Sequence, residues 1–149
     1  MSEVRPIRVY LDSNILIHLI EGSEAFKAVL WPLVEAIDEG GIVVVTSDIA
    51  YAEVMVKPFA NNQDTYIHAH GALMSGAGPL QIAPVTRAVL KRSGQLRAQL
   101  GGKLADSIHV ATAVEEGCSH FVSEDAGIRA PEGLELTKAA DLPGLLVLR

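Results

Sequence analysis

Apolar residues along this chain follow two alternating patterns. Short runs that are apolar at nearly every position are typical of strands buried on both faces of a sheet. Longer segments between these runs carry apolar residues three and four positions apart, as amphipathic helices do. Five segments are therefore predicted as strands: 8–11, 42–46, 80–84, 119–123 and 133–138.

The helical spacing predicts six helices, and local residues indicate where they start and stop. In the second helix, Phe26, Val29, Leu33 and Ile37 fall on one stripe. Ser47 is expected to cap the third helix, and Pro58 is expected to end it. The predicted helices cover residues 15–20, 24–39, 47–57, 61–74, 84–100 and 103–116.

Strands that alternate with helices predict an α/β fold. We expect a three-layer α/β/α domain whose central parallel sheet is covered on both faces. The length of 149 residues corresponds to a single domain spanning 1–149. The mean hydropathy is +0.28, yet the longest apolar runs are far shorter than the roughly 18 to 20 residues of a membrane span. The apolar residues therefore build a core, and no membrane segment is expected.

The composition limits which binding partners and which cell compartment are expected for this protein. The formal net charge of −6 does not indicate broad electrostatic binding to nucleic acid. The first ten residues lack the pattern of a signal peptide. The only cysteine, Cys118, leaves no partner for an internal disulfide and is expected to be a small buried residue. These features predict a cytoplasmic protein.

Four acidic residues occupy positions that a parallel sheet brings together. Asp12 ends the first predicted strand, and Asp125 follows the fourth. Glu53 and Asp106 lie on the helices 47–57 and 103–116. Functional groups of parallel sheets gather at the carboxyl ends of the strands. Asp12 and Asp106 have apolar neighbours, and an ionised carboxylate in such a place needs a partner.

Repulsion among these carboxylates predicts a bound cation. Two like charges about 4 Å apart repel by about 4 kcal/mol at an effective dielectric constant near 20. The N-terminus of a helix stabilises Asp106 by only about 0.3 to 1 kcal/mol. Hard ligands that are all oxygen favour Mg²⁺ or Mn²⁺, with water in the remaining positions. Asn14 is close enough in sequence to Asp12 to bond a metal-bound water or a phosphate.

Four short motifs carry a resemblance to a known family. They are "YLDSNILI" with Asp12, "TSDIAYAEV" with Glu53, "LADSIHVATA" with Asp106, and "FVSEDAGI" with Asp125, the last followed by "APEGLEL". In this order and spacing the motifs resemble those of PIN domain nucleases, and more narrowly the VapC-type toxins of toxin–antitoxin pairs. The resemblance covers nearly the whole chain, although residues 55–78 match no motif.

The resemblance implies a PIN-like fold and a metal-dependent endoribonuclease. Asp12, Glu53, Asp106 and Asp125 would bind one or two Mg²⁺ or Mn²⁺ ions and hydrolyse RNA phosphodiester bonds. Asn14 and Ser123 match small polar positions of the motifs and would orient water or phosphate. The family also implies a homodimer and a cognate antitoxin protein.

Each of these residues also has a plainer interpretation. Ser13 or Asn14 caps the helix that follows the first strand, with or without a role in the site. Ser123 caps the turn after its strand. Asp106 is an ordinary acid in the first turn of a helix, and Glu53 is a solvated residue on a helix face.

The histidines and the basic residues also have plainer interpretations beside the functional ones. His109 is either a packed helix residue with a satisfied ring or, with Asp106, part of a metal pair. His68 and His70 are interpreted as surface residues. One concentration of basic residues is either a solvated face or a rim that binds RNA phosphates beside the acidic centre. Its members are Arg87, Lys91, Arg92, Arg97 and Lys103.

Two other functions compete with the nuclease. A catalytically silent PIN-like module would bind RNA or protein without cleaving. A phosphohydrolase with an aspartate nucleophile would use Asp12, but such enzymes place a second aspartate two residues later, and that position is Asn14. An amide cannot transfer the proton that this mechanism needs.

Overall fold

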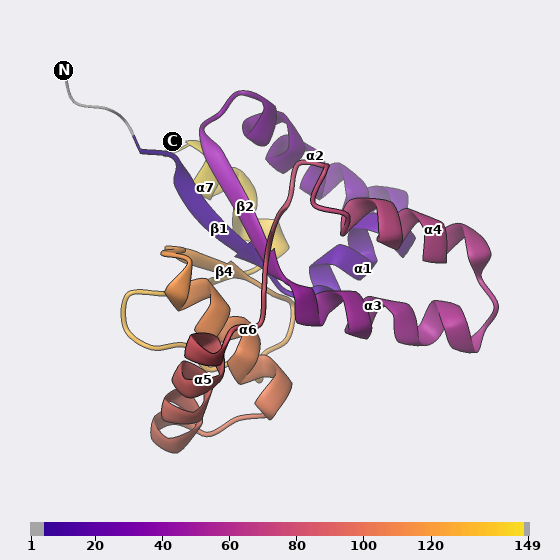
Figure 1. Ribbon diagram of the computed structural model, residues 1–149. Coiled ribbons are helices and arrows are strands. Elements are labelled where there is room, and N and C mark those ends of the chain that lie inside the picture. Colours follow the sequence, from indigo (N-terminus) through magenta and orange to yellow (C-terminus); the bar gives the residue numbers. More distant parts are fainter. Residues whose placement is uncertain (1–4, 148–149) are drawn as a thin grey trace.

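The computed structural model describes residues 5–147, and a parallel five-stranded sheet lies at their centre (Figure 1). The strand order across the sheet is β3-β2-β1-β4-β5, and every neighbouring pair is parallel. All five predicted strands are therefore present. Their bounds are β1 Ile7–Leu11, β2 Ile42–Ser47, β3 Gln81–Ala83, β4 His120–Val122 and β5 Glu135–Thr137.

Helices connect the strands and cover both faces of the sheet (Figure 1). Within the described residues, the α-helices are α1 Ser13–Glu21, α2 Glu24–Asp38, α3 Asp48–Ala60, α4 Asp64–Leu73, α5 Arg87–Leu100, α6 Leu104–Glu115 and α7 Leu142–Val147. A short 3₁₀ turn, Ala139–Asp141, precedes α7. None of the helices in this part of the chain combines the length and the hydropathy needed to cross a lipid bilayer.

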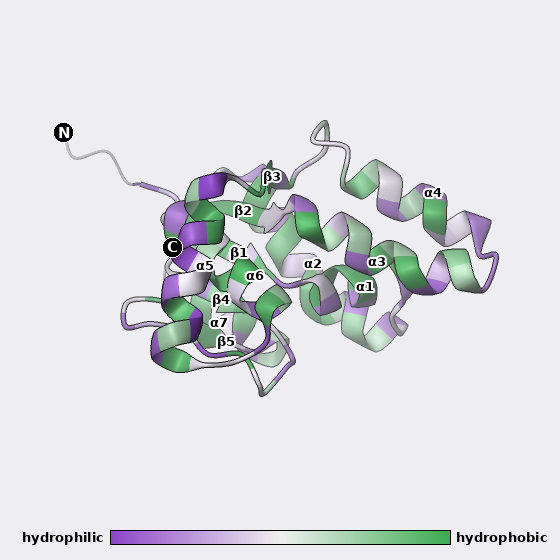
Figure 2. Cartoon of the chain, turned by 60° about the horizontal axis from the view of Figure 1, so that its bottom comes forward, coloured by the Kyte–Doolittle hydropathy of each residue, from purple (hydrophilic) through white to green (hydrophobic). Residues whose placement is uncertain are grey.

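Alternating residues of the central strand β1 point into two separate hydrophobic cores. Val9 and Leu11 belong to a core with residues of α1, α2, α3 and α7. Tyr10 points to the other face, where residues of α5 and α6 form a second core. The apolar colouring of the central strands and of α6 is visible in Figure 2. The predicted three-layer α/β/α architecture is thus confirmed. Cys118 lies in the second core, where burial raises the pKa of its thiol to about 12.

Several helix ends differ from the prediction for identifiable reasons. Helix α3 continues through Pro58 to Ala60, because a proline in the last turn removes one hydrogen bond without stopping the residues after it. Helix α4 starts only at Asp64, since Asn62 has a positive φ of 52° and turns the chain. Helix α5 starts after Thr86, whose side chain accepts a hydrogen bond from the amide of Val89 at 3.1 Å.

Two further features concern the ends of helices. Helix α7 was not predicted, and Leu142, Leu145 and Leu146 pack it into the first core. The predicted break between α5 and α6 is present, and both of its residues, Gly101 and Gly102, have φ near +76° and +91°. A side chain is strained in that region of φ, so glycine suits both positions.

The chain topology predicts the ligand-binding crevice of an open α/β sheet beyond the carboxyl ends of β1 and β4. The chain passes from β1 outward to β2 and β3, and then returns to place β4 on the other side of β1. The order of the strands therefore reverses between β1 and β4, and open α/β sheets bind their ligands at such a point, beyond the carboxyl ends of the strands. Asp12 follows β1 here, and Ser123 follows β4.

Candidate active site

Asp12 lies at the carboxyl end of β1 and starts helix α1. Its backbone amide donates to the carbonyl of Val122 at 3.0 Å, which ties the ends of β1 and β4 together. Its side chain is buried, and Oδ1 accepts a hydrogen bond from the amide of Ser13 at 2.8 Å. Asp12 itself is therefore the N-cap of α1, and the expectation that Ser13 or Asn14 would cap this helix was wrong. The backbone of Asp12 is still extended, whereas Ser13 is already helical.

Two predicted polar residues hold the other oxygen of Asp12. The hydroxyl of Ser123 donates to Asp12 Oδ2 at 2.7 Å. The amide nitrogen of Asn14 lies 3.1 Å from the same oxygen and 3.1 Å from Ser123 Oγ. Asn14 Oδ1 accepts from the backbone amide of Glu124 at 3.3 Å. Asn14 and Ser123 therefore fix the orientation of the Asp12 carboxylate.

Asp125 lies in the turn after β4, next to this network. Its backbone amide donates to Ser123 Oγ at 3.0 Å, so the predicted turn-capping role of Ser123 exists alongside its bond to Asp12. Asp125 Oδ1 accepts from the amide of Gly127 at 2.8 Å, which closes the turn. The side chain of Asp125 is exposed at the edge of the crevice.

Asp106, in the first turn of α6, completes a group of three neighbouring aspartates. Burial raises the pKa of its carboxyl above the ordinary value, and the negative charges of Asp125 and Asp12 raise it further. His109 and Lys103 lower this pKa in part. No hydrogen bond to another described residue involves the Asp106 side chain. The structure thus brings three of the four predicted acids close enough to repel one another.

Glu53 is connected to the three aspartates through the side chain of His109. It lies on α3 with 32% of its side chain exposed, and Nε2 of His109 forms a hydrogen bond with its Oε1. The same nitrogen lies 3.7 Å from Asp12 Oδ1. His109 is fully buried on α6, as expected for a packed helix residue. Glu53 is therefore neither a solvated surface acid nor in direct contact with the aspartates.

Tyr10 occupies the other side of the His109 ring. Its hydroxyl lies 2.5 Å from His109 Nδ1, and its ring stacks on Phe121 at a centroid distance of 5.0 Å. Burial raises the pKa of Tyr10 well above its ordinary value, and the charge of Asp12 raises it further. The phenol therefore stays protonated, and both nitrogens of His109 have hydrogen-bond partners.

The comparisons with known proteins identify the family. The family model of the PIN domain matches residues 9–134. The chain belongs to the PIN domain family. The resemblance drawn from the four motifs is thereby confirmed, and the acid of each motif lies within the matched range. No curated protein matches this sequence.

Solved structures share the fold at low sequence identity. A toxin–antitoxin complex from Klebsiella pneumoniae is 22% identical, covers 85% of this chain and 94% of that chain, and gives a TM-score of 0.60. VapBC2 from Rickettsia felis, bound to a promoter DNA fragment, is 16% identical over 89% and 98%, with a TM-score of 0.68. VapC20 from Mycobacterium tuberculosis, described as a sarcin–ricin loop cleaving toxin, is 14% identical over 80% and 92%, with a TM-score of 0.61.

The acids of this PIN domain fit a hydrated divalent cation better than a dry metal cage. Among the described residues, no three His, Cys, Asp or Glu side chains are gathered tightly enough to hold an ion by themselves. The donors are hard carboxylate oxygens, which suit Mg²⁺ or Mn²⁺, and Mg²⁺ keeps several waters when it binds to one or two carboxylates. Within residues 5–147, no arginine or lysine forms an ion pair with Asp12 or Asp106 to neutralise the site. Burial and the charges of Asp125 and Asp12 raise the Asp106 pKa, and a bound cation would relieve the repulsion among these carboxylates.

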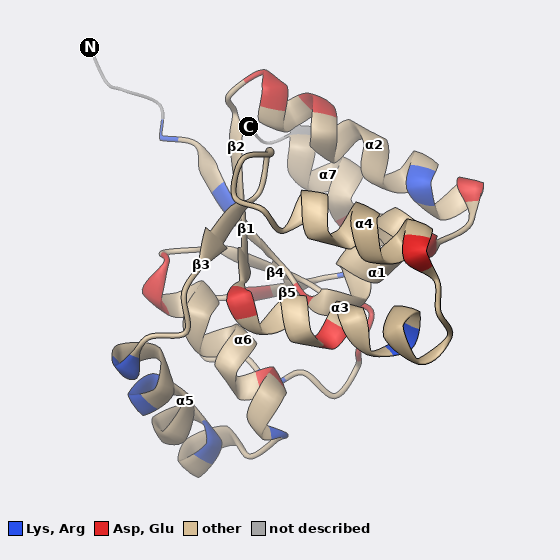
Figure 3. Ribbon diagram, turned by 45° about the vertical axis from the view of Figure 1, so that its right-hand side comes forward, with Lys and Arg blue, Asp and Glu red and all other residues tan. Residues whose placement is uncertain are grey.

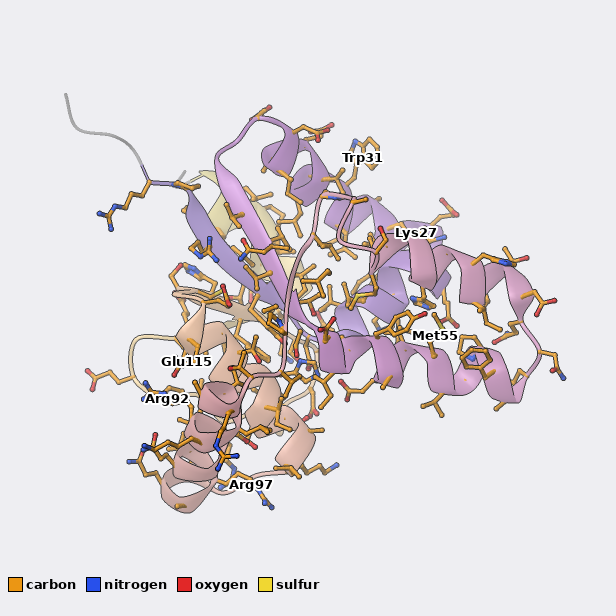
Figure 4. All side chains as sticks on the ribbon, viewed as in Figure 1. Lys27, Trp31, Met55, Arg92, Arg97 and Glu115 are labelled. Atoms are coloured by element: carbon orange, nitrogen blue, oxygen red, sulfur yellow. The ribbon has the colours of Figure 1, made fainter. Side chains whose placement is uncertain are left out.

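The predicted basic residues do not form one group. Those on α5 lie along the outer side of the PIN domain (Figure 3). Arg92 is paired with Glu115 at 2.9 Å, and both side chains are labelled in Figure 4. Arg97 donates to the carbonyl of Gly102 at 3.3 Å. Arg87 and Lys91 are exposed one turn apart. Lys103, the N-cap residue of α6, is close enough to lower the pKa of Asp106.

One interpretation of a histidine was wrong. His70 was expected on the surface, but it is fully buried on α4, where its Nε2 lies 2.7 Å from Oε2 of Glu21 on α1. A signal was present in the sequence, because Ile67 and Met74 lie three and four residues away and both contact the first core. His68 is exposed, as expected.

Proposed function

We propose that this PIN domain is a metal-dependent endoribonuclease and the cytoplasmic toxin of a toxin–antitoxin pair. One observation carries the proposal: three aspartates from separate parts of the chain lie close together near the carboxyl ends of β1 and β4, where burial and then their mutual repulsion raise the pKa of Asp106. The likeness in fold to VapBC complexes and to VapC20, which is described as a sarcin–ricin loop cleaving toxin, supports the proposed nuclease activity and an antitoxin as the partner.

The four acids share one role in the proposed mechanism. Asp12, Asp106, Asp125 and Glu53 would supply oxygen ligands for one or two Mg²⁺ or Mn²⁺ ions. A bound divalent ion lowers the pKa of a coordinated water and neutralises charge on the phosphodiester. The chain itself holds Asp12 in place with Ser123 and Asn14.

Positive charges near the crevice are proposed to hold the RNA backbone. Lys103 stands beside Asp106 and would contact a phosphate next to the cleaved bond. Arg87 and Lys91 are exposed on α5, and they offer charge to the RNA backbone farther from the centre. Arg92 and Arg97 already have partners, so we assign them a smaller share of RNA binding.

Exposed apolar side chains favour protein partners. Val56 and Phe59 on α3 are 68% and 62% exposed, and Trp31 on α2 is 61% exposed. Trp31 points away from the sheet (Figure 4). Apolar groups of this size on a surface mark interaction sites when they are contiguous. We propose that such surfaces serve a homodimer and the antitoxin, and sedimentation of the purified protein tests the dimer.

A catalytically silent PIN module is the second candidate. It is favoured by the fact that the acids of the described residues are not assembled into a cluster of three ligands. A silent module would bind RNA or protein, and its RNA affinity would not depend on Mg²⁺. The phosphohydrolase is not supported, because the chain belongs to the PIN family and Asn14 donates to Asp12 where a second aspartate would be needed.

Sequencing of RNA ends tests the nuclease. The wild type, Asp12→Asn and Asp48→Asn are expressed briefly in a heterologous bacterium, where Asp48 is an exposed acid on α3 that serves as the control. We expect the wild type and Asp48→Asn to produce the same new RNA ends and to arrest growth, and Asp12→Asn to do neither. Purified wild type should lose cleavage in a chelator and regain it with Mg²⁺ or Mn²⁺.

The same RNA then tests whether the basic residues bind RNA and whether the protein is a silent module. Binding is measured in the Asp12→Asn background, with charge reversal at Arg87 and Lys91 together. We expect affinity to fall about tenfold and the salt dependence to become shallower. New RNA ends of equal abundance from Asp12→Asn would remove this site from the reaction. Binding that is independent of Mg²⁺, without any cleavage, would favour the silent module.

A further inference from the structure

We propose that His109 is a positioning residue that holds the Glu53 carboxylate in place for a divalent cation, and that Tyr10 sets the orientation and the tautomer of its ring. This inference rests on the proposed function, because it concerns the same site. The observation behind it is a buried chain of contacts, Tyr10 to His109 to Glu53, that joins β1, α6 and α3 behind the aspartates.

The ring of His109 has no freedom to turn. It is fully buried, and both of its nitrogens are bonded, Nδ1 to the hydroxyl of Tyr10 at 2.5 Å and Nε2 to Oε1 of Glu53. Tyr10 is also fully buried and stacks on Phe121. The partners lie 99 and 56 residues away in sequence, so only the packed fold creates this arrangement.

When the ring of His109 is neutral, its hydrogen-bond partners decide which nitrogen carries the proton. A carboxylate can only accept, so Nε2 carries the proton that bonds Glu53. Nδ1 is then an acceptor, and the protonated hydroxyl of Tyr10 donates to it. If the proton moved to Nδ1, a nitrogen lone pair would face the Glu53 carboxylate, and the carboxylate would be repelled. Tyr10 therefore maintains the donor that Glu53 needs.

Anchoring one oxygen leaves the other available. Glu53 has 32% of its side chain exposed and a flexible stem, so without an anchor the carboxylate could turn to solvent. His109 binds Oε1, and no hydrogen bond within the described residues involves Oε2. The Nε2–H group also lies 3.7 Å from Asp12 Oδ1, between two like charges that it attracts. His109 thus holds Glu53 close to Asp12 with one oxygen left to bind a cation.

The same geometry indicates that His109 positions Glu53 and does not itself bind the metal ion. A metal ligand needs a free ring nitrogen, and neither nitrogen of His109 is free. Neighbours that orient ligands typically change metal affinity by about 10- to 100-fold when they are removed. The expected signature is therefore a weaker affinity for the cation with little change in the reaction at saturating cation.

Calorimetric titration with MnCl₂ tests the proposal, together with the Mn²⁺ concentration for half-maximal RNA cleavage. We expect His109→Leu to weaken Mn²⁺ binding about 10- to 100-fold and to leave the rate at saturating Mn²⁺ within a few fold. His109→Gln keeps an N–H donor near the position of Nε2 and should recover most of the affinity. Tyr10→Phe removes the donor to Nδ1 and should weaken binding about three- to tenfold, and it covers the case in which His109→Leu does not fold.

A matched control comes from the other buried histidine. His70→Leu also breaks a contact between a buried histidine and a glutamate, and it should lower the melting temperature without changing Mn²⁺ affinity. Unchanged Mn²⁺ affinity in His109→Leu and Tyr10→Phe overturns the proposal, even if both variants melt at lower temperature. A wild type that binds Mn²⁺ without cleaving RNA contradicts the nuclease but still tests His109. A wild type that binds no Mn²⁺ contradicts both.

Discussion

Two buried histidines in this PIN domain each bond a glutamate, and they lie in different surroundings. His109 and His70 are both fully buried, and each uses Nε2 to contact its glutamate. The pair of His109 and Glu53 joins α6 to α3 at the carboxyl ends of the strands. The pair of His70 and Glu21 joins α4 to α1 among the helices that cover the first core.

The surroundings make the two pairs unequal. Nδ1 of His109 is bonded to Tyr10, whereas Nδ1 of His70 is buried without a hydrogen-bond partner. The side chain of Glu53 is 32% exposed, but that of Glu21 is only 11% exposed. The first pair therefore presents a carboxylate oxygen to the crevice, and the second encloses its carboxylate. The same two residue types support a site in one place and the packing of helices in the other.

The largest expected effect comes from removing the charge of each glutamate. Glu53→Gln should lower the rate of RNA cleavage about 100-fold or more, because a neutral amide is a poor ligand for a hard cation. Glu21→Gln should leave the rate within about threefold, since Glu21 lies outside the crevice. Single-turnover cleavage of an RNA identified by end sequencing measures both. An equal loss in the two variants would show that the pairs do not differ in the way proposed.

A second test measures how much the His70–Glu21 pair contributes to the stability of the fold. His70→Leu leaves the Glu21 charge buried without a partner and should lower the free energy of unfolding by roughly 2 to 4 kcal/mol. His70→Leu combined with Glu21→Met replaces the whole pair with apolar groups and should recover most of this loss. Urea denaturation monitors the change. If the double variant is no more stable than the single one, the enclosed charge is not the cause.

The smallest expected effect concerns the charge of Asp106, which lies near the pair of His109 and Glu53. The pKa of Asp106 is raised in the folded chain, so the folded state binds this proton more tightly than the unfolded state does. Stability contributed by protonated Asp106 is present at low pH. It is lost as the pH rises from the ordinary carboxyl pKa through the raised one.

Asp106→Asn removes this dependence on pH. In the presence of a chelator at pH 7, the variant should melt at a slightly higher temperature than the wild type, and solvent screening at this partly exposed position keeps the gain small. The gain should vanish at a pH below the ordinary carboxyl pKa. Asp48→Asn, at an exposed position on α3, should show no such gain at pH 7. Thermal melts over a range of pH would refute the electrostatic origin if the gain were independent of pH.

The order of strands and helices and the positions of the acids could be read from the sequence, because they depend on local patterns. Periodicity predicted all five strands, and the motifs placed Asp12 and Asp125 just beyond two of them. Since parallel strands share one edge for their carboxyl ends, a meeting of these acids followed from the fold class alone. Helix α7 was missed because its short apolar sequence shows no distinctive period.

Tertiary structure alone decided which polar groups became partners. The bonds of His109 to Tyr10 and to Glu53 span 99 and 56 residues, and the bond of His70 to Glu21 spans 49. The sequence around a histidine describes its own helix face, whereas its partner is set by how that helix packs against others. The sequence therefore determined where the carboxylates would gather, and the packing of α3 and α6 determined that Glu53 would reach them through a buried imidazole.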